Sequence, residues 1–125
     1  MLDIVLVDDN PVDQRLFQDA LKETGIECQV RTAFNGKDGL SLVKNKKPDL
    51  LVLDVMMPGM SGYDVCNALK FDPSREEGLP ILLLTGRQEE IDPRIGKLMK
   101  VYYLQKPCEP GVLKEMIQNI CKAKI

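Results

Sequence analysis

The sequence predicts a doubly wound α/β domain, in which a five-stranded parallel sheet carries helices on both faces. Short, unbroken apolar runs, typical of strands buried on both faces, alternate with stretches whose apolar residues recur at helical spacing. Parallel neighbours need crossover helices, which this alternation supplies. With 125 residues, 44% hydrophobic and 29% charged, the chain has the size and composition of one globular domain with a core. We therefore expect residues 1–125 to form a single domain.

Five apolar runs are the expected strands. The third is the clearest, because it is bounded by Pro48 on one side and by Pro58 and Gly59 on the other. The second alternates weakly and is expected to be more exposed. The expected strands are residues 4–7, 28–32, 50–53, 80–85 and 101–104.

The helices between these strands have recognisable start signals. Asn10 and Pro11 suit the cap and first position of a helix that ends at Gly25. Ser61 and Asp64 resemble a capping box, with Asp64 in place of the usual Glu or Gln. The other helices are expected around residues 36–43, around 91–99 with Pro93 in the first turn, and over 113–120 with Pro110 near the start.

Composition excludes several classes of function. With 17 basic and 19 acidic residues, the formal charge of -2 argues against general binding to nucleic acid or membranes. No apolar stretch approaches the roughly 20 residues of a membrane span, and no secretory signal is present, so we expect a cytoplasmic protein. Histidine is absent, which removes Ser-His-Asp and Cys-His mechanisms and histidine metal ligands. The scattered cysteines are expected to be free thiols: Cys28, Cys66, Cys108 and Cys121.

Polar residues stand at the carboxyl ends of four expected strands. Asp8 and Asp9 follow the first strand, Asp54 ends the third, Thr85 ends the fourth, and Lys106 follows the fifth. Taken singly, these residues suit helix caps, turns, a strand or a surface lysine. Open α/β sheets bind ligands at this edge, and three clustered carboxylates repel one another unless a cation gathers them. Oxygen-only ligands favour Mg²⁺, and such a site suits phosphoryl chemistry.

Four motifs in this order resemble the receiver domain of two-component response regulators, such as the chemotaxis regulator. They are VDDN at residues 7–10, LDVMMPGMSG at 53–62, LLLTG at 82–86 and YLQKP at 103–107. The likeness covers essentially the whole chain. It implies a flavodoxin-like fold with strand order 2-1-3-4-5 and a role in phosphorelay signal transduction, not in enzyme turnover.

The resemblance also implies roles at the acidic cluster. Asp54 would accept a phosphoryl group, as a 4-aspartylphosphate, from a phosphohistidine on a sensor histidine kinase or a histidine phosphotransfer protein. The absence of histidine in this chain fits a donor supplied by a partner. Asp8, Asp9, Asp54 and the backbone carbonyl of Met56 would hold Mg²⁺.

Other implied roles concern the fourth and fifth strands. Thr85 and Lys106 would bind phosphoryl oxygens, and the peptide bond before Pro107 is a candidate for the cis form. Thr85 would then move toward the phosphoryl group and Tyr103 would turn inward. This switch would alter the face made by the fourth helix, the fifth strand and the fifth helix, where an output partner or a second copy, in a phosphorylation-dependent homodimer, would bind.

Several features depart from the family pattern or suit other classes. Gly86 stands where the family usually has Ala or Ser, and the usual Gly-Ala pair before the fifth strand is absent; together with Pro93, these departures concern the output face. A docking module that works without phosphorylation is one alternative. A phosphatase of the haloacid dehalogenase type is another, although it needs an acid where Met56 stands. A flavin-binding module would need Ser, Thr and Gly after the first strand in place of Asp8 and Asp9.

Overall fold

The computed structural model describes residues 1–70, 78–86 and 101–122, and its centre is one five-stranded sheet. The strand order is β2-β1-β3-β4-β5, and every neighbouring pair is parallel. The predicted doubly wound sheet and its strand order are therefore confirmed. The strands are β1 (Leu2–Val7), β2 (Cys28–Ala33), β3 (Leu50–Asp54), β4 (Ile81–Thr85) and β5 (Val101–Gln105).

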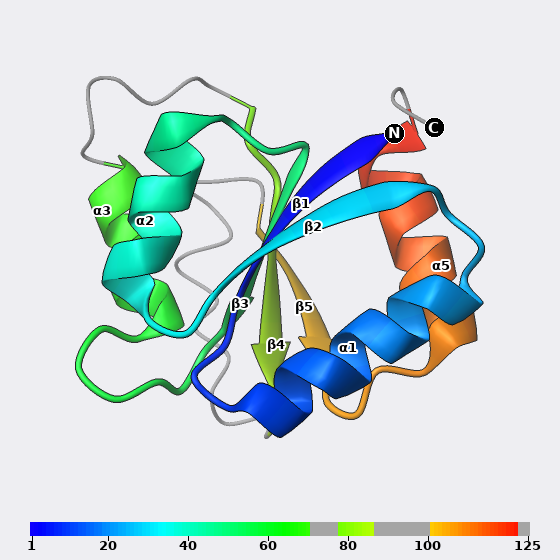
Figure 1. Ribbon diagram of the computed structural model, residues 1–125, viewed down its shortest axis with the longest axis horizontal. Coiled ribbons are helices and arrows are strands. Elements are labelled where there is room, and N and C mark those ends of the chain that lie inside the picture. Colours follow the sequence, from blue (N-terminus) through cyan, green and yellow to red (C-terminus); the bar gives the residue numbers. More distant parts are fainter. Residues whose placement is uncertain (71–77, 87–100, 123–125) are drawn as a thin grey trace.

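Helices cover both faces of this sheet (Figure 1). One face carries α1 and α5, which pack against each other, and the opposite face carries α2 and α3. The helix expected around residues 91–99, with Pro93, lies outside the described residues. The described helices are α1 (Pro11–Glu23), α2 (Gly36–Asn45), α3 (Gly62–Lys70) and α5 (Pro110–Ile120).

The core consists of two apolar layers, one on each side of the sheet. Along β1, Ile4 and Leu6 belong to the layer under α1 and α5, while Val5 and Val7 belong to the layer under α2 and α3. Successive side chains of a strand point to opposite faces, so a strand covered on both sides must be apolar throughout. This explains the unbroken runs in the sequence, and the more exposed β2 lies at the edge of the sheet as expected.

Side-chain caps fix how α1 and α3 leave the loops that follow β1 and β3. The Asn10 Oδ1 atom accepts hydrogen bonds from the backbone N–H of Val12 at 2.9 Å and of Asp13 at 3.2 Å. In the predicted capping box, the Ser61 N–H donates to Asp64 Oδ2 at 2.9 Å, and the Asp64 N–H donates to Ser61 Oγ at 3.2 Å. Both helices therefore start at defined positions beside the carboxyl edge of the sheet.

The cysteines agree with the expectation from composition. None of the four cysteines forms a disulfide, and burial raises the pKa of Cys66 to about 12, so that thiol stays protonated. Within the described ranges, no helix combines the length and apolar character that crossing a membrane would require.

Candidate functional site

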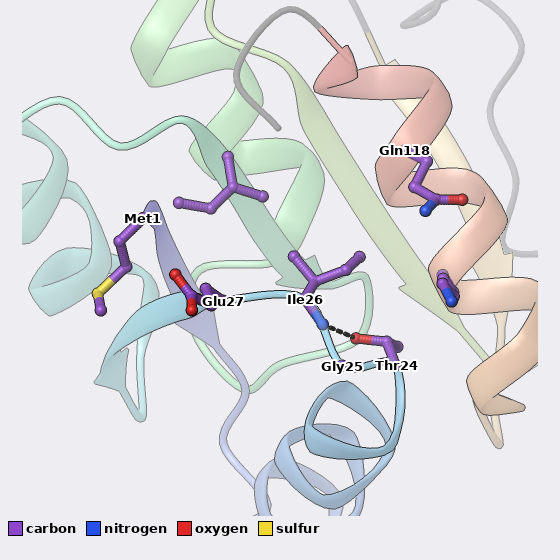
Figure 2. Close-up of a pocket in the computed structure, with 8 residues that line it drawn as sticks. Met1, Thr24, Gly25, Ile26, Glu27 and Gln118 are labelled. Carbon is purple, nitrogen blue, oxygen red and sulfur yellow. Dashed lines mark hydrogen bonds between the residues drawn. The ribbon is translucent and has the colours of Figure 1, made fainter.

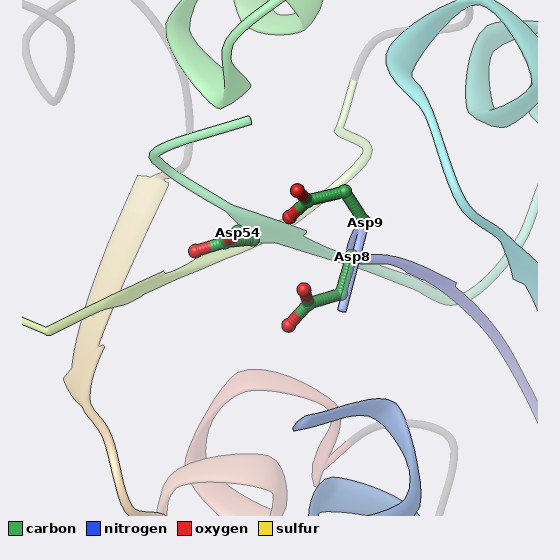
Figure 3. Close-up of side chains that lie close together, drawn as sticks. All are labelled: Asp8, Asp9 and Asp54. Carbon is green, nitrogen blue, oxygen red and sulfur yellow. The ribbon is translucent and has the colours of Figure 1, made fainter. Parts of the chain in front are cut away.

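The sheet brings three acidic side chains together at its carboxyl edge. Strands β1 and β3 are neighbours, with Val7 beside Leu53, so the residues that follow or end these strands lie side by side. Figure 3 shows Asp8 and Asp9 leaving the end of β1 and Asp54 at the end of the adjacent strand. One carboxylate oxygen from each of these acids lies within 4.8 Å of the others. The three acids picked out in the sequence thus share one pocket.

Lys106 supplies the positive charge of this pocket. Its Nζ atom lies 3.0 Å from Asp8 Oδ2 and 3.2 Å from Asp54 Oδ1. A third carboxylate, that of Asp13 in the first turn of α1, lies 3.0 Å from the same atom. The ammonium has three N–H donors, so each carboxylate can take one.

The other predicted site residues lie on or near β3, β4 and β5. Thr85 ends β4 and is buried, and its carbonyl oxygen accepts the backbone N–H of Lys106 at 2.8 Å. The peptide bond between Lys106 and Pro107 is cis. Tyr103 is half-buried and packs against the apolar layer under α2 and α3. Met56 follows β3 by two residues, and its side chain is exposed.

Burial and charge set the protonation of the two central groups. Burial raises the pKa of Asp54 to about 6; the nearby Lys106 lowers this pKa, while Asp8 and Asp9 raise it. For Lys106, burial alone would lower the pKa, but hydrogen bonds to Asp13 and Asp8 and the charge of Asp54 raise it above its ordinary value. At neutral pH the pocket therefore holds an ammonium and a carboxylate at Asp54 that is mostly ionised.

Gln14 of α1 holds the loop that carries the acid pair. Its side chain is buried, and Nε2 donates to the carbonyl oxygens of Asp8 at 3.0 Å and Ala33 at 2.7 Å. The Oδ1 atom of Asp8 in turn accepts the backbone N–H of Asn10 at 2.9 Å. The Asp8 carboxylate is thus fixed through one oxygen by the loop and through the other by Lys106.

Gly62 allows α3 to begin directly against the end of β3. A methyl group at this position would lie 2.6 Å from the carbonyl oxygen of Asp54. The Gly62 N–H donates to the Val55 carbonyl at 2.9 Å, so the two segments are also tied by a backbone hydrogen bond. The position of Asp54 therefore depends on a residue without a side chain at this contact.

Asp13 and Gln14 were not among the residues expected at the site. In the sequence they fall within an amphipathic helix and suggest only a helix start. A usable signal was present, because a helix that begins two residues after an acid pair places its first turn beside the strand end. The contact between Asp13 and Lys106 spans 93 residues, which local patterns do not reveal.

The donor set fits a hard divalent cation. Asp8, Asp9 and Asp54 offer carboxylate oxygens only, and the clustered ligand atoms include neither nitrogen nor thiolate. Mg²⁺ prefers such oxygen ligands, and a dication offsets the repulsion that three close carboxylates otherwise suffer. Among the described residues, these three side chains are the ones grouped closely enough to hold Mg²⁺.

A separate hollow of about 490 Å³ lies near the amino end of β1. Figure 2 shows Met1 and Glu27 on one side, Gln118 of α5 on the other, and Ile26 between them. The Ile26 N–H donates to Thr24 Oγ1 at 3.1 Å within its wall. This hollow is at the opposite end of β1 from Asp8 and does not contribute to the acidic pocket.

Comparisons with known proteins bear on the class of protein that this sheet and pocket define. Over residues 4–118 the chain matches the family of response regulator receiver domains, and it belongs to this family. It is 35% identical over 123 residues to the transcriptional regulatory protein AfsQ1 of Streptomyces coelicolor, covering 98% of this chain and 52% of AfsQ1. It is 31% identical over 121 residues to protein PilH of Pseudomonas aeruginosa, covering 96% of this chain and 98% of PilH.

A solved structure supports the same fold. The chemotaxis protein CheY4 of Vibrio cholerae is 28% identical and superposes with a TM-score of 0.75, covering 96% of this chain and 98% of that one. The chain thus spans about half the length of AfsQ1 and nearly all of PilH. The predicted resemblance to two-component receiver domains is confirmed.

Proposed function

We propose that Asp54 accepts a phosphoryl group from a phosphohistidine on a partner protein, in a reaction that depends on Mg²⁺. One observation carries this proposal: a buried strand-end carboxylate stands 3.2 Å from a lysine ammonium and beside two further acids. The arrangement combines a nucleophile, a counter-charge for phosphoryl oxygens and a set of cation ligands in one pocket. The partner would be a sensor histidine kinase or a histidine phosphotransfer protein.

Asp54 needs no general base for this step, because its carboxylate is largely ionised at neutral pH. A carboxylate oxygen forms the new O–P bond while the N–P bond of the donor breaks, and the electron pair of that bond stays on the imidazole that leaves. Lys106 is placed to offset the negative charge that spreads over the phosphoryl oxygens. Asp8, Asp9, Asp54 and the backbone carbonyl of Met56 would hold Mg²⁺, which when bound adds further positive charge there.

Thr85 and Tyr103 would carry the change to the surface. Thr85 is buried at the end of β4, and Tyr103 lies on the adjacent β5, where it pairs in register with Leu83. Phosphorylation adds roughly 1.5 to 2 negative charges and new hydrogen-bond acceptors. Movement of the Thr85 hydroxyl toward them would free space for Tyr103 and alter the surface that includes β5 and α5.

The biological setting belongs to the proposal as well. AfsQ1 is named a transcriptional regulator, so an output domain attached to a receiver like this one is one readout; a separate output partner or a phosphorylation-dependent homodimer is another. We propose that the domain works in the cytoplasm and does not turn over free substrates. A haloacid dehalogenase-type phosphatase would need an acid two residues after Asp54, where the exposed Met56 stands.

Incubation with acetyl phosphate and Mg²⁺, followed by intact mass measurement, tests this function. We expect one added phosphoryl group in the wild-type protein, none in Asp54→Asn, and wild-type behaviour in Asp19→Asn, which removes an exposed acid from α1. Chelation of Mg²⁺ should abolish labelling. Wild-type protein that stays unlabelled would favour the phosphorylation-independent docking module, and label that persists in Asp54→Asn would move the acceptor elsewhere.

A further inference from the structure

Among the described residues, Asp13 is the one ion-pair partner of Lys106 that the proposed phosphoryl transfer leaves without a role. Its Oδ2 atom lies 3.0 Å from Nζ, as close as that of Asp8 and closer than Oδ1 of Asp54. The Asp13 side chain is 33% exposed, whereas that of Lys106 is 21% exposed. The contact is therefore partly shielded from water and is not a fully solvated surface pair.

Asp13 differs from the other acids in what it can bind. In the portion of the chain that the structure describes, the carboxylates that could share a cation are those of Asp8, Asp9 and Asp54 only. Asp13 lies outside that group, and its carboxylate contacts Lys106 instead. Together with Lys106 and Leu84 it also lines a mostly apolar hollow of about 250 Å³.

We propose that Asp13 is a positioning residue that competes with the incoming phosphoryl group for the ammonium of Lys106 and thereby restrains phosphorylation of Asp54. This inference rests on the proposed function. The phosphoryl oxygens need N–H donors of Lys106. When Asp8 binds the cation and Asp54 receives the phosphoryl group, two of the three donors are released, but the third stays engaged by Asp13. Asp13 also adds a fourth negative charge beside the three clustered acids, which favours binding of a cation there.

Two measurements on Asp13→Asn separate this role from a structural one. Affinity for Mg²⁺ is measured by calorimetry without a phosphodonor, and the rate of labelling by acetyl phosphate is measured at saturating Mg²⁺. Removing the charge should weaken Mg²⁺ binding by about threefold and raise the labelling rate by about fivefold. A disturbed fold would instead lower both the affinity for Mg²⁺ and the labelling rate. Asp19→Asn, which makes the same charge change on the same helix, should leave both close to wild type.

A second arm tests whether the effect passes through the lysine. In a Lys106→Gln background, Asp13→Asn should no longer raise the labelling rate, because the competition for the ammonium is gone. Asp13→Ala should resemble Asp13→Asn, and thermal unfolding shows whether either variant is folded. If the wild type is labelled but Asp13→Asn and Asp13→Ala match Asp19→Asn or are slower, the inference is wrong and the proposed function stands. If the wild type takes no label, both the inference and the proposed function are wrong.

Discussion

Replacing the proposed acceptor, Asp54→Asn, should stabilise the protein at neutral pH. Asp54 is only 7% exposed, and burial raises the pKa of its carboxyl group from 3.8 to about 6 despite the nearby lysine. A raised carboxyl pKa means that the folded state disfavours the ionised form. Asparagine has nearly the same shape and cannot ionise, so the variant lacks this cost.

The pH dependence follows from proton binding. Between about pH 3.8 and pH 6 the folded protein holds the Asp54 proton and the unfolded chain does not, so stability falls as the pH rises through this window. Above pH 6 the full cost of ionising Asp54 in the folded state is present, and a rise of the pKa from 3.8 to about 6 corresponds to about 3 kcal/mol. At pH 4.5 only about 1 kcal/mol of it should remain.

Urea unfolding of chelator-treated wild type, Asp54→Asn and Asp19→Asn at pH 7 and pH 4.5 measures this difference. We expect Asp54→Asn to exceed the wild type by about 3 kcal/mol at pH 7 and by about 1 kcal/mol at pH 4.5, with no such trend in Asp19→Asn. A loss of stability at pH 7, or a gain equally large at both pH values, would refute the electrostatic account of the pocket.

Three further substitutions test the supports of the site. Gly62→Ala should cost about 1–3 kcal/mol and slow labelling of Asp54, because its methyl would meet a backbone carbonyl at 2.6 Å; Gly86→Ala, which meets nothing within 4 Å, is the control in urea unfolding. Lys106→Gln should raise the pKa of Asp54 above 6, since the lysine lowers it; a carboxyl NMR titration that shows no rise would contradict this. Gln14→Leu should cost about 1–3 kcal/mol and weaken calorimetric Mg²⁺ binding, because the carbonyl oxygens of Asp8 and Ala33 each lose the hydrogen bond from Gln14, although the Ala33 oxygen keeps that from the Asp8 N–H. Unchanged affinity would show that the loop keeps its position without Gln14.

Strands buried on both faces were predictable because their signal is local. The strand expected at residues 50–53 is observed at Leu50–Asp54, and the strand expected at 28–32 is observed at Cys28–Ala33. Strand β1 begins two residues before the expected start at residue 4, and it includes Asp3. Arg31 of β2 donates to both carboxylate oxygens of Asp3 at 3.1 Å, so the neighbouring strand makes an acid acceptable in the sheet. A local hydrophobic pattern does not contain that partner.

The meeting of Asp8, Asp54 and Lys106 at one edge of the sheet was predictable from the same kind of local signal. Asp8 and Asp54 follow or end buried strands and Lys106 follows the partly exposed β5, and parallel topology alone places such residues at one edge. The contact between Asp13 and Lys106 instead depends on the direction in which α1 leaves its cap and on the path of the chain after β5. Both are set by packing between segments far apart in the sequence. The acid pair and the helix start could place the first turn of α1 near the site, but the ion pair itself is seen only in the folded structure.

The geometry also explains how a pocket with this much negative charge can form in a stable domain. Hydrophobic burial on both faces forces β1, β3 and β4 together, and this brings Asp8 and Asp54 close whatever their charges. Lys106 contacts both at about 3 Å and so acts as an internal counter-ion in the unmodified protein. Burial still raises the pKa of Asp54 to about 6 against the pull of Lys106, so the lysine offsets only part of the cost. Because part of the cost of ionising Asp54 remains, added positive charge would stabilise its carboxylate further. This is the property that a cation-dependent phosphoacceptor requires.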